Sequence, residues 1–291
     1  MHEARQRGIA TVGMVRSWDN LTCKGLVRVV PDTLVVNNAI VAEEAEELNS
    51  IPSERIKLIG IPHYDRYSEP AHDRSTFAKA IGMKPDQRFI LYAPTGDRYL
   101  AENNTDRNVI KLLASLVPSS HEVLVRLPPS DTVDLDGLNL SNVRIFRPGQ
   151  QMSPNSAEFK FNELTREDDD LLRDMVAYSD LLVSGPSTIV IDAAVYDKPI
   201  ILIGFDGKTE RPYLKSVRHY YDYDHFRPVM ESGGAKLVSN EGALKDAVRG
   251  YLADSKLDAA GRAIIREREC FKLDQKSSER LVEVLREAMH G

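Results

Sequence analysis

The stretch SGPSTIVID, residues 184–192, decides the fold predicted for this chain. It follows a short apolar run, residues 181–183, which is typical of a buried strand. It leads into an apolar helix that is expected to end at Lys198-Pro199, and the next strand is predicted at residues 200–203. The pattern therefore predicts a β-α-β unit with a small polar turn at the carboxyl end of its first strand.

This turn predicts a site for a phosphate group. A strand-to-helix turn exposes backbone N–H groups at a helix N-terminus, where the helix dipole also favours negative charge. The predicted donors are the N–H groups and hydroxyls of Ser184, Gly185, Ser187 and Thr188, and the carboxylate of Asp192 is expected to hold a ribose. The turn alone is equally compatible with a plain capped helix, in which Ser187 is the N-cap and Asp192 is a solvated charge.

The composition is that of an ordinary globular protein with one large or two modest domains. A net charge of −6 argues against nucleic acid as a partner. Cys23 and Cys270 lie far apart and match neither a disulfide framework nor a metal-binding spacing, which suits a reducing cytoplasm. The sequence shows no long apolar run and no basic-then-apolar leader, so any contact with the inner face of the membrane is expected to be peripheral.

Strands and helices alternate regularly from residue 89 onward, and this alternation predicts a parallel, doubly wound sheet that is covered on both faces. The expected domains are a partial N-terminal α/β segment, 1–67, a Rossmann-like nucleotide-binding domain, 68–272, and a C-terminal helix, 273–291, that packs back against the N-terminal part. Strands of the sheet are predicted at residues 89–93, 122–127, 143–146, 181–183, 200–203 and 236–238.

Polar turns follow four of the predicted strands. They begin near Pro94, Pro128, Pro148 and Ser184 and are rich in Gly, Pro, Ser or Thr. Ligands of open α/β sheets bind beyond the carboxyl ends of the strands, so these turns are expected to line a cleft. Thr95-Gly96, in the first of them, is predicted to close the nucleotide site from the side opposite the 184–188 turn.

An aromatic stretch, RHYYDYDHFR at residues 218–227, lies between the last two predicted strands. It is either a long loop packed down by its own aromatic side chains or a lid that brings His219 or His225 to the cleft. The spacing of its aspartates and histidines matches no strong metal motif, so no metal site is predicted.

Several stretches resemble the CDP-glycerol glycerophosphotransferase-like proteins and related surface-polysaccharide glycosyltransferases. The resemblance extends over most of the chain from Gly8 onward, with the motifs in the same order. The resembling stretches are RSWDNLTCKG at 16–25, ILYAPT at 90–95, YSDLLVSGPST at 178–188 with Asp192 and Lys198-Pro199, HYYDY at 219–223 and DQKSSER at 274–280.

The resemblance implies a GT-B architecture, in which two Rossmann-like domains are present and the C-terminal one binds the nucleotide. It implies transfer of a sugar or glycerol-phosphate unit from a CDP- or UDP-linked sugar or alditol to an acceptor, without an obligatory metal or another cofactor. The acceptor classes implied are cell-surface polysaccharide, teichoic-acid-like and lipid-linked glycans. Two alternatives stay open: a UDP-sugar 2-epimerase-like enzyme, and a non-catalytic nucleotide-binding remnant.

The sequence departs from the family at the expected catalytic base. The histidine of the family's WHGTPLK loop aligns with Asp19, so Asp19 is the predicted base, with His63 and His219 as the next candidates. Trp18 is then expected to stack on the acceptor and Lys24 to offset charge. The alternative is that Trp18 only anchors packing and that Asp19 and Asn20 only hydrogen-bond the turn.

Two further departures concern the donor side and the chain length. The relatives' RxHP strand end reads RLPP at residues 126–129, so a histidine near the phosphates is missing. The residues before His63 are too few for a complete N-terminal GT-B domain. The expectation is therefore a reduced domain, a domain completed by a partner chain or a second copy, or a truncated reading frame.

Overall fold

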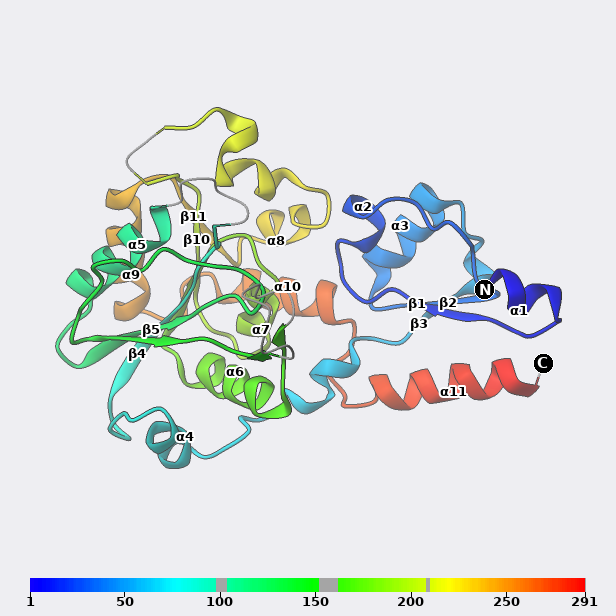
Figure 1. Cartoon of the computed structure of the whole chain (residues 1–291), viewed down its shortest axis with the longest axis horizontal. Coiled ribbons are helices and arrows are strands. Elements are labelled where there is room, and N and C mark those ends of the chain that lie inside the picture. The colour runs from blue at the N-terminus through cyan, green and yellow to red at the C-terminus, as the bar shows by residue number, and fades with distance from the viewer. Residues whose placement is uncertain (98–103, 152–161, 208–209, 291) are drawn as a thin grey trace. The chain divides into compact units, whose positions relative to one another are not determined.

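The computed structural model describes residues 1–97, 104–151, 162–207 and 210–290 (Figure 1). The chain divides into two compact units. Unit 1 comprises residues 1–68, 223–228 and 264–291, and unit 2 comprises residues 69–222 and 229–263. These boundaries differ from the expected domain ranges, because residues 223–228 and 264–272 pack with the N-terminal segment rather than with the large sheet.

The strands are β1 (Val12–Met14), β2 (Thr33–Val36), β3 (Ile56–Leu58), β4 (Arg88–Ala93), β5 (His121–Arg126), β6 (Val143–Phe146), β7 (Gln150–Gln151), β8 (Asn162–Glu163), β9 (Leu181–Ser184), β10 (Ile200–Ile203) and β11 (Lys236–Val238). The α-helices are α1 (His2–Gln6), α2 (Asn20–Cys23), α3 (Ala39–Asn49), α4 (Arg74–Ala80), α5 (Thr105–Leu116), α6 (Arg166–Tyr178), α7 (Ile189–Val195), α8 (Arg227–Glu231), α9 (Glu241–Ala253), α10 (Ala259–Cys270) and α11 (Ser277–His290). Short 3-10 helices lie at Ser53–Arg55, Pro62–Arg66, Tyr213–Lys215 and Val217–Asp222.

Unit 2 is built on a six-stranded sheet with the order β11-β10-β9-β4-β5-β6. All of its neighbouring strands pair in parallel, which confirms the predicted fold and the six predicted strands. The strand order reverses between β4 and β9, so the turns that follow these two strands lie next to each other at the carboxyl edge. A separate antiparallel pair, β7 and β8, was not expected from the sequence.

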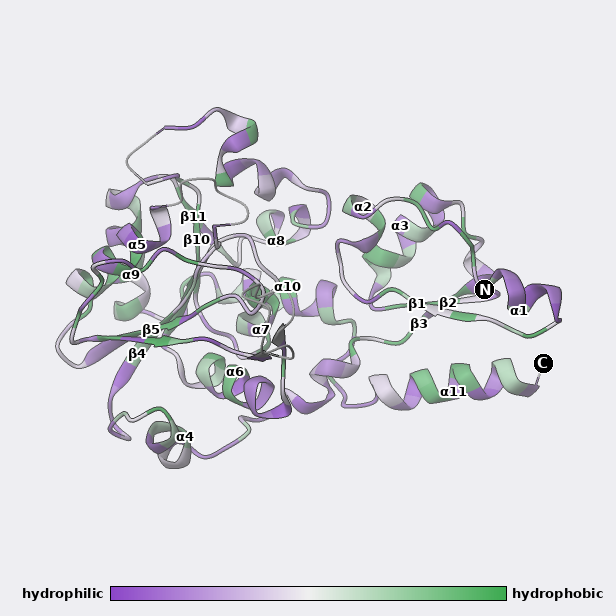
Figure 2. Ribbon diagram, viewed as in Figure 1, coloured by the Kyte–Doolittle hydropathy of each residue, from purple (hydrophilic) through white to green (hydrophobic). Residues whose placement is uncertain are grey.

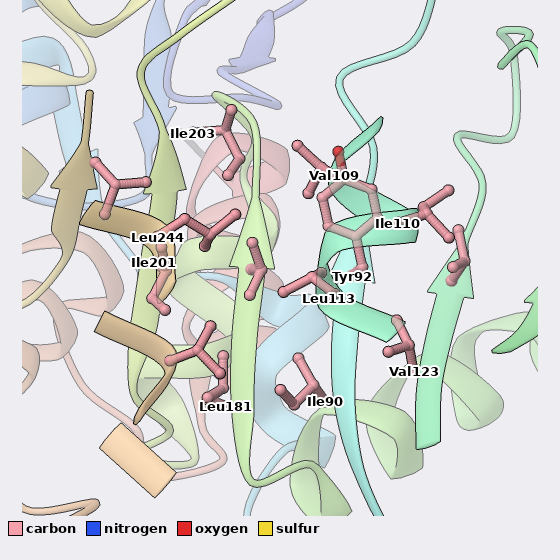
Figure 3. Close-up of a cluster of buried hydrophobic side chains, with 14 of the residues drawn as sticks. Ile90, Tyr92, Val109, Ile110, Leu113, Val123, Leu181, Ile201, Ile203 and Leu244 are labelled. Carbon is pink, nitrogen blue, oxygen red and sulfur yellow. The ribbon is translucent and has the colours of Figure 1, made fainter. Parts of the chain in front are cut away.

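The two faces of the large sheet are covered by different helices. Alternate strand residues, among them Ile90, Tyr92 and Leu181, are buried with Ile110 and Leu113 of α5 on one face (Figure 3). Helix α9 contributes to the same core, while α6 and α7 contact β4, β9 and β10. Strands buried on both faces explain the continuous apolar runs in the sequence.

Unit 1 contains a smaller parallel sheet with the order β1-β2-β3. Helix α3 covers one face, where Val36 packs with Val41 and Ala45. On the other face Val284 of α11 packs with Val35 and Ile59. Helix α11 alternates hydrophobic and hydrophilic residues along its length, as expected for a helix that covers a sheet with one side (Figure 2).

The carboxylate of Asp65 caps α11 by accepting hydrogen bonds from the backbone N–H groups of Ser277 (3.0 Å) and Ser278 (2.7 Å). Among the helices that the structure describes, none combines the length and the apolar character needed to cross a bilayer.

Candidate functional site

The turns after β4 and β9 lie in direct contact at the carboxyl edge of the large sheet. The N–H group of Gly185 donates to the carbonyl of Ala93 (3.3 Å). A Cβ atom built on Gly185 would lie only 2.1 Å from Oγ1 of Thr95, so no other residue fits here without displacing that turn. The predicted proximity of Thr95 to the 184–188 turn is therefore present in the structure.

The buried carboxylate of Asp106, in the first turn of α5, holds the turn after β4. It accepts hydrogen bonds from the N–H groups of Thr95 and Gly96, both at 3.0 Å, and from the hydroxyl of Tyr92 at 2.5 Å. The two backbone donors are thus already used, which leaves the Thr95 hydroxyl as the group of this pair that can donate to a ligand. Asp106 was not among the site residues predicted from the sequence, although an acidic residue early in the helix that follows a strand-end turn is a recognisable capping signal.

The turn between β9 and α7 has backbone donors available for an anion. In the part of the chain that the structure describes, no group accepts a hydrogen bond from the N–H groups of Ser187 or Thr188. The Ser187 hydroxyl accepts weakly from the N–H of Ile189 (3.5 Å), and Thr188 is exposed. Thr188 rather than Ser187 is the N-cap, and its side chain makes no capping bond. These donors lie in the turn for which the sequence predicts a phosphate, and the binding of a phosphate there stays a prediction.

Two other predicted ligands of the nucleotide are buried. Ser184 is fully buried, and its hydroxyl has no hydrogen-bond partner among the described residues. As the last residue of β9, it shares the face of Leu182, against which α7 packs. Asp192 is only 6% exposed, so the alternative of a solvated charge at this position is wrong. Its role toward a ribose stays a prediction.

A cavity of about 270 Å³ lies beyond the carboxyl ends of β10 and β11. It is lined by Gly204–Gly207, Glu210, Arg218 and Ser239. Arg218 is oriented by hydrogen bonds to the Ser216 hydroxyl (2.9 Å) and to the carbonyl of Arg211 (3.0 Å). The cavity therefore offers the guanidinium of Arg218 at the same edge of the sheet as the two turns, a feature that was not predicted from the sequence.

The predicted base, Asp19, lies in unit 1 and forms an ion pair with Lys24 at 2.9 Å. Burial raises the pKa of Asp19, but hydrogen bonds from Ser17 and Lys24 and the charge of Lys24 outweigh burial, so the pKa is lowered overall. Asp19 is therefore a weak proton acceptor. The neighbouring Asn20 accepts from the N–H groups of Arg16 and Ser17, both at 3.1 Å, as the turn alternative expected.

The reserve bases lie in different units. His63, in unit 1, is exposed and contacts the hydroxyl of Tyr67 through Nε2 (3.0 Å). His219, in unit 2, has Nδ1 at 2.6 Å from the carbonyl of Ser216 and its ring against Tyr220. The structure does not test the predicted roles of these two histidines.

The aromatic stretch at 218–227 is packed down by two of its own side chains. Tyr221 is buried and donates its hydroxyl to the carbonyl of Ile203 (2.8 Å), and Phe226 is 1% exposed. Its end belongs to unit 1, where His225 and Phe226 contact the ring of Trp18. Across the described residues, no group of three or more His, Cys, Asp or Glu side chains is suited to hold a metal ion.

Comparison with known proteins gives one curated relative, the teichoic acid glycerol-phosphate primase of Bacillus spizizenii strain W23. The two sequences are 24% identical over 203 residues, which is 69% of this chain and 48% of the primase. The chain thus spans about half the length of the curated relative that it matches.

The fold is shared with solved structures of GT-B type. The wall teichoic acid polymerase TagF aligns with a TM-score of 0.60 at 17% identity, covering 88% of this chain and 57% of TagF. The UDP-GlcNAc 2-epimerase of Methanocaldococcus jannaschii, solved with UDP-GlcNAc and UDP, aligns with a TM-score of 0.56 at 14% identity, covering 90% of this chain and 62% of the epimerase. S. aureus MnaA, solved with UDP, aligns with a TM-score of 0.58 at 14% identity, covering 89% of this chain and 61% of MnaA.

The family match extends over nearly the whole chain. The model of the CDP-Glycerol:Poly(glycerophosphate) glycerophosphotransferase family matches residues 27–287, a range that includes both strand-end turns and most of α11. Since far more than half of the sequence is matched, the chain belongs to the CDP-glycerol:poly(glycerophosphate) glycerophosphotransferase family.

Proposed function

We propose that this chain is a transferase that moves a glycerol-phosphate or sugar unit from a nucleotide-activated donor to a teichoic-acid-like, surface-polysaccharide or lipid-linked acceptor. Family membership supports the reaction class. The observation that carries the proposal is the turn after β9, where the N–H groups of Ser187 and Thr188 are not used by the described protein groups.

The donor diphosphate is proposed to lie on this turn. Two backbone N–H groups and the hydroxyls of Ser187 and Thr188 supply hydrogen bonds, and the dipoles of these aligned amides favour an anion. Gly185 allows Thr95 to approach within contact distance, so the Thr95 hydroxyl adds a donor from the other side. In the proposed arrangement Asp192 turns toward the ribose and Arg218 offsets remaining negative charge.

The nucleotide is expected to be CDP- or UDP-linked. This expectation is supported by one TagF structure that was obtained after a soak with CDPG and by MnaA, which was solved with UDP. Isothermal titration calorimetry with CDP, UDP, GDP and ADP tests the proposal, which predicts measurable binding of CDP or UDP to the isolated protein.

Removing the side-chain donors of the turn is expected to weaken this binding. In the Ser187→Ala/Thr188→Ala double variant, two hydroxyl bonds to phosphate oxygens are lost while the backbone donors remain. Each lost charge-assisted bond costs about 1.5–3 kcal/mol, so the dissociation constant should rise by at least about tenfold. Ser119→Ala is the matched control, because Ser119 is exposed and precedes β5 at the opposite edge of the sheet.

If the double variant binds as tightly as Ser119→Ala, the phosphate is held elsewhere. If none of the four nucleotides binds to the unmodified chain, the proposed donor site is wrong.

A UDP-sugar 2-epimerase-like activity is the second candidate, because the fold is shared with solved 2-epimerases. Product analysis separates the two functions. Transfer requires an acceptor and releases the nucleotide, whereas epimerisation converts the nucleotide sugar alone. A chain that binds nucleotide but forms neither product would be the non-catalytic alternative.

A further inference from the structure

His225 is held on the loop that carries Asp19, although about 200 residues separate them in sequence. Its Nδ1 atom lies 3.3 Å from Oγ1 of Thr22 and 3.4 Å from Sγ of Cys23. Its ring lies 5.2 Å from the ring of Trp18, measured between centroids. All of these residues belong to unit 1. The imidazole is therefore fixed by several contacts at the place where the sequence predicted a base.

The two nitrogens of the His225 ring have different surroundings. Nδ1 lies within hydrogen-bond distance of Oγ1 of Thr22 and Sγ of Cys23, and Oγ1 of Thr22 also lies 3.8 Å from Sγ of Cys23. When Nδ1 carries the proton and donates it to Oγ1 of Thr22, the lone pair of the neutral ring is on Nε2. Nε2 has no hydrogen-bond partner among the residues that the structure describes, and the side chain is only half-buried. In that tautomer the lone pair on Nε2 is available to an incoming hydroxyl.

The charges near this ring favour His225 over Asp19 as the proton acceptor. Protonating Asp19 would break its ion pair with Lys24. Burial lowers the pKa of His225, which keeps the ring neutral near pH 7, while the carboxylates of Asp19 and Asp224 oppose this effect and stabilise the imidazolium once it forms. The positive charge of Lys24 acts against these two carboxylates and lowers the pKa of His225.

We propose that His225 is the general base of the transfer reaction and that Asp19 is a positioning residue that stabilises its protonated form. This role rests on the proposed transferase function. Nε2 takes the proton of the acceptor hydroxyl as the hydroxyl oxygen forms a bond to the transferred phosphorus or anomeric carbon. The bond from that atom to the nucleotide's phosphate oxygen breaks, and its electron pair leaves with the nucleotide. His225 later releases the proton to water.

The direct test is turnover of the full chain carrying His225→Gln. A general base contributes about 10²- to 10⁴-fold, so kcat should fall by that factor. The dissociation constant for CDP or UDP should not change, because His225 is not one of the residues proposed to hold the donor. His290→Gln is the matched control, since His290 is exposed at the end of α11 and has no proposed role. A loss smaller than tenfold would overturn the role of His225.

Two further measurements separate a base from a residue that only supports the loop. Added imidazole should restore part of the rate of His225→Ala, and no restoration would count against the proposal. In the pH–rate profile of the wild type, the rate should fall as the pH drops below the pKa of His225, which is lower than 6.5. The profile of His225→Gln should not show this fall. A profile that is unchanged in the variant would contradict proton transfer to His225.

The effect of the Asp19 charge on His225 can be measured by NMR titration of the His225 ring, which does not require enzyme turnover. Asp19→Asn should lower the pKa of His225, because a neighbouring negative charge is removed; an unchanged pKa would overturn the positioning role. If the wild-type chain transfers nothing from any donor, the proposed function fails, and the role of His225 as base fails with it. If the wild type is active and His225→Gln retains its rate, only the role of His225 fails.

Discussion

Replacing Asp106 by alanine is expected to destabilise unit 2 by about 3–5 kcal/mol, because an unpaired buried donor costs far more than an exposed one. Asp106 is 1% exposed. Its carboxylate accepts from the hydroxyl of Tyr92, which is fully buried, and from the backbone N–H groups of Thr95 and Gly96. Alanine would leave all three donors without this acceptor. Urea unfolding followed by circular dichroism measures the loss.

Two further variants serve as comparisons for Asp106→Ala in this experiment. Asp106→Asn keeps one acceptor oxygen, so its loss should lie between those of the wild type and the alanine variant. Asp86→Ala removes an exposed carboxylate of the same unit and should change the free energy of unfolding by less than about 0.5 kcal/mol. Nucleotide affinity should fall in Asp106→Asn, because the turn that it holds touches Gly185. If Asp106→Ala is as stable as Asp86→Ala, the carboxylate does not organise this turn.

Replacing Glu269 by glutamine is expected to stabilise the protein at pH 8 by about 1–3 kcal/mol, with little effect at pH 4. Burial and the nearby charge of Glu44 raise the pKa of Glu269 from 4.5 to about 7. Burial and the charge of Asp224 raise the pKa of Glu44 to about 7 as well. Arg268 and the hydrogen bond from Asn38 reduce the effect at Glu269 without cancelling it.

The sign follows from proton binding. The folded state holds the proton of Glu269 more tightly than the unfolded chain does, so the free energy of unfolding falls as the pH rises from 4.5 to about 7. Glutamine has no proton to lose and still offers an oxygen to Nδ2 of Asn38, now 3.4 Å from the carboxylate. Thermal unfolding at several pH values checks this dependence.

Glu267→Gln is the control for the charge change, because Glu267 is exposed on the same helix, α10. Its stability should follow the wild-type pH dependence. A Glu269→Gln curve parallel to that of the wild type between pH 4.5 and 7 would show that Glu269 does not bind its proton unusually tightly in the folded state.

Local sequence patterns were sufficient for the elements and for the large sheet. Apolar runs of three to five residues that end in polar turns specified the central strands β4, β9 and β10, because a strand buried on both faces is apolar throughout. The turn at residues 184–188 was predicted correctly as a strand-to-helix connection, since Gly, Pro, Ser and Thr favour this backbone locally.

Burial of single polar residues could not be predicted in the same way. From the sequence, Asp192 was expected to be either a solvated charge or a ligand of the ribose. In the structure its side chain is only 6% exposed, because α7 is buried along most of its length. Ser184 is likewise enclosed. The apolar periodicity of a short helix does not show how completely neighbouring elements cover it.

The sequence by itself therefore determined the parallel sheet, the strand-to-helix turn at residues 184–188 and the resemblance to glycerophosphotransferases. Only the tertiary structure decided that Thr95 touches Gly185, that Asp106 holds the turn after β4, and that His225 joins the loop of Asp19. The physical reason is the range of the interactions. Backbone preferences and hydrophobic periodicity act between near neighbours, whereas these contacts depend on strand register and on packing between segments far apart in the chain.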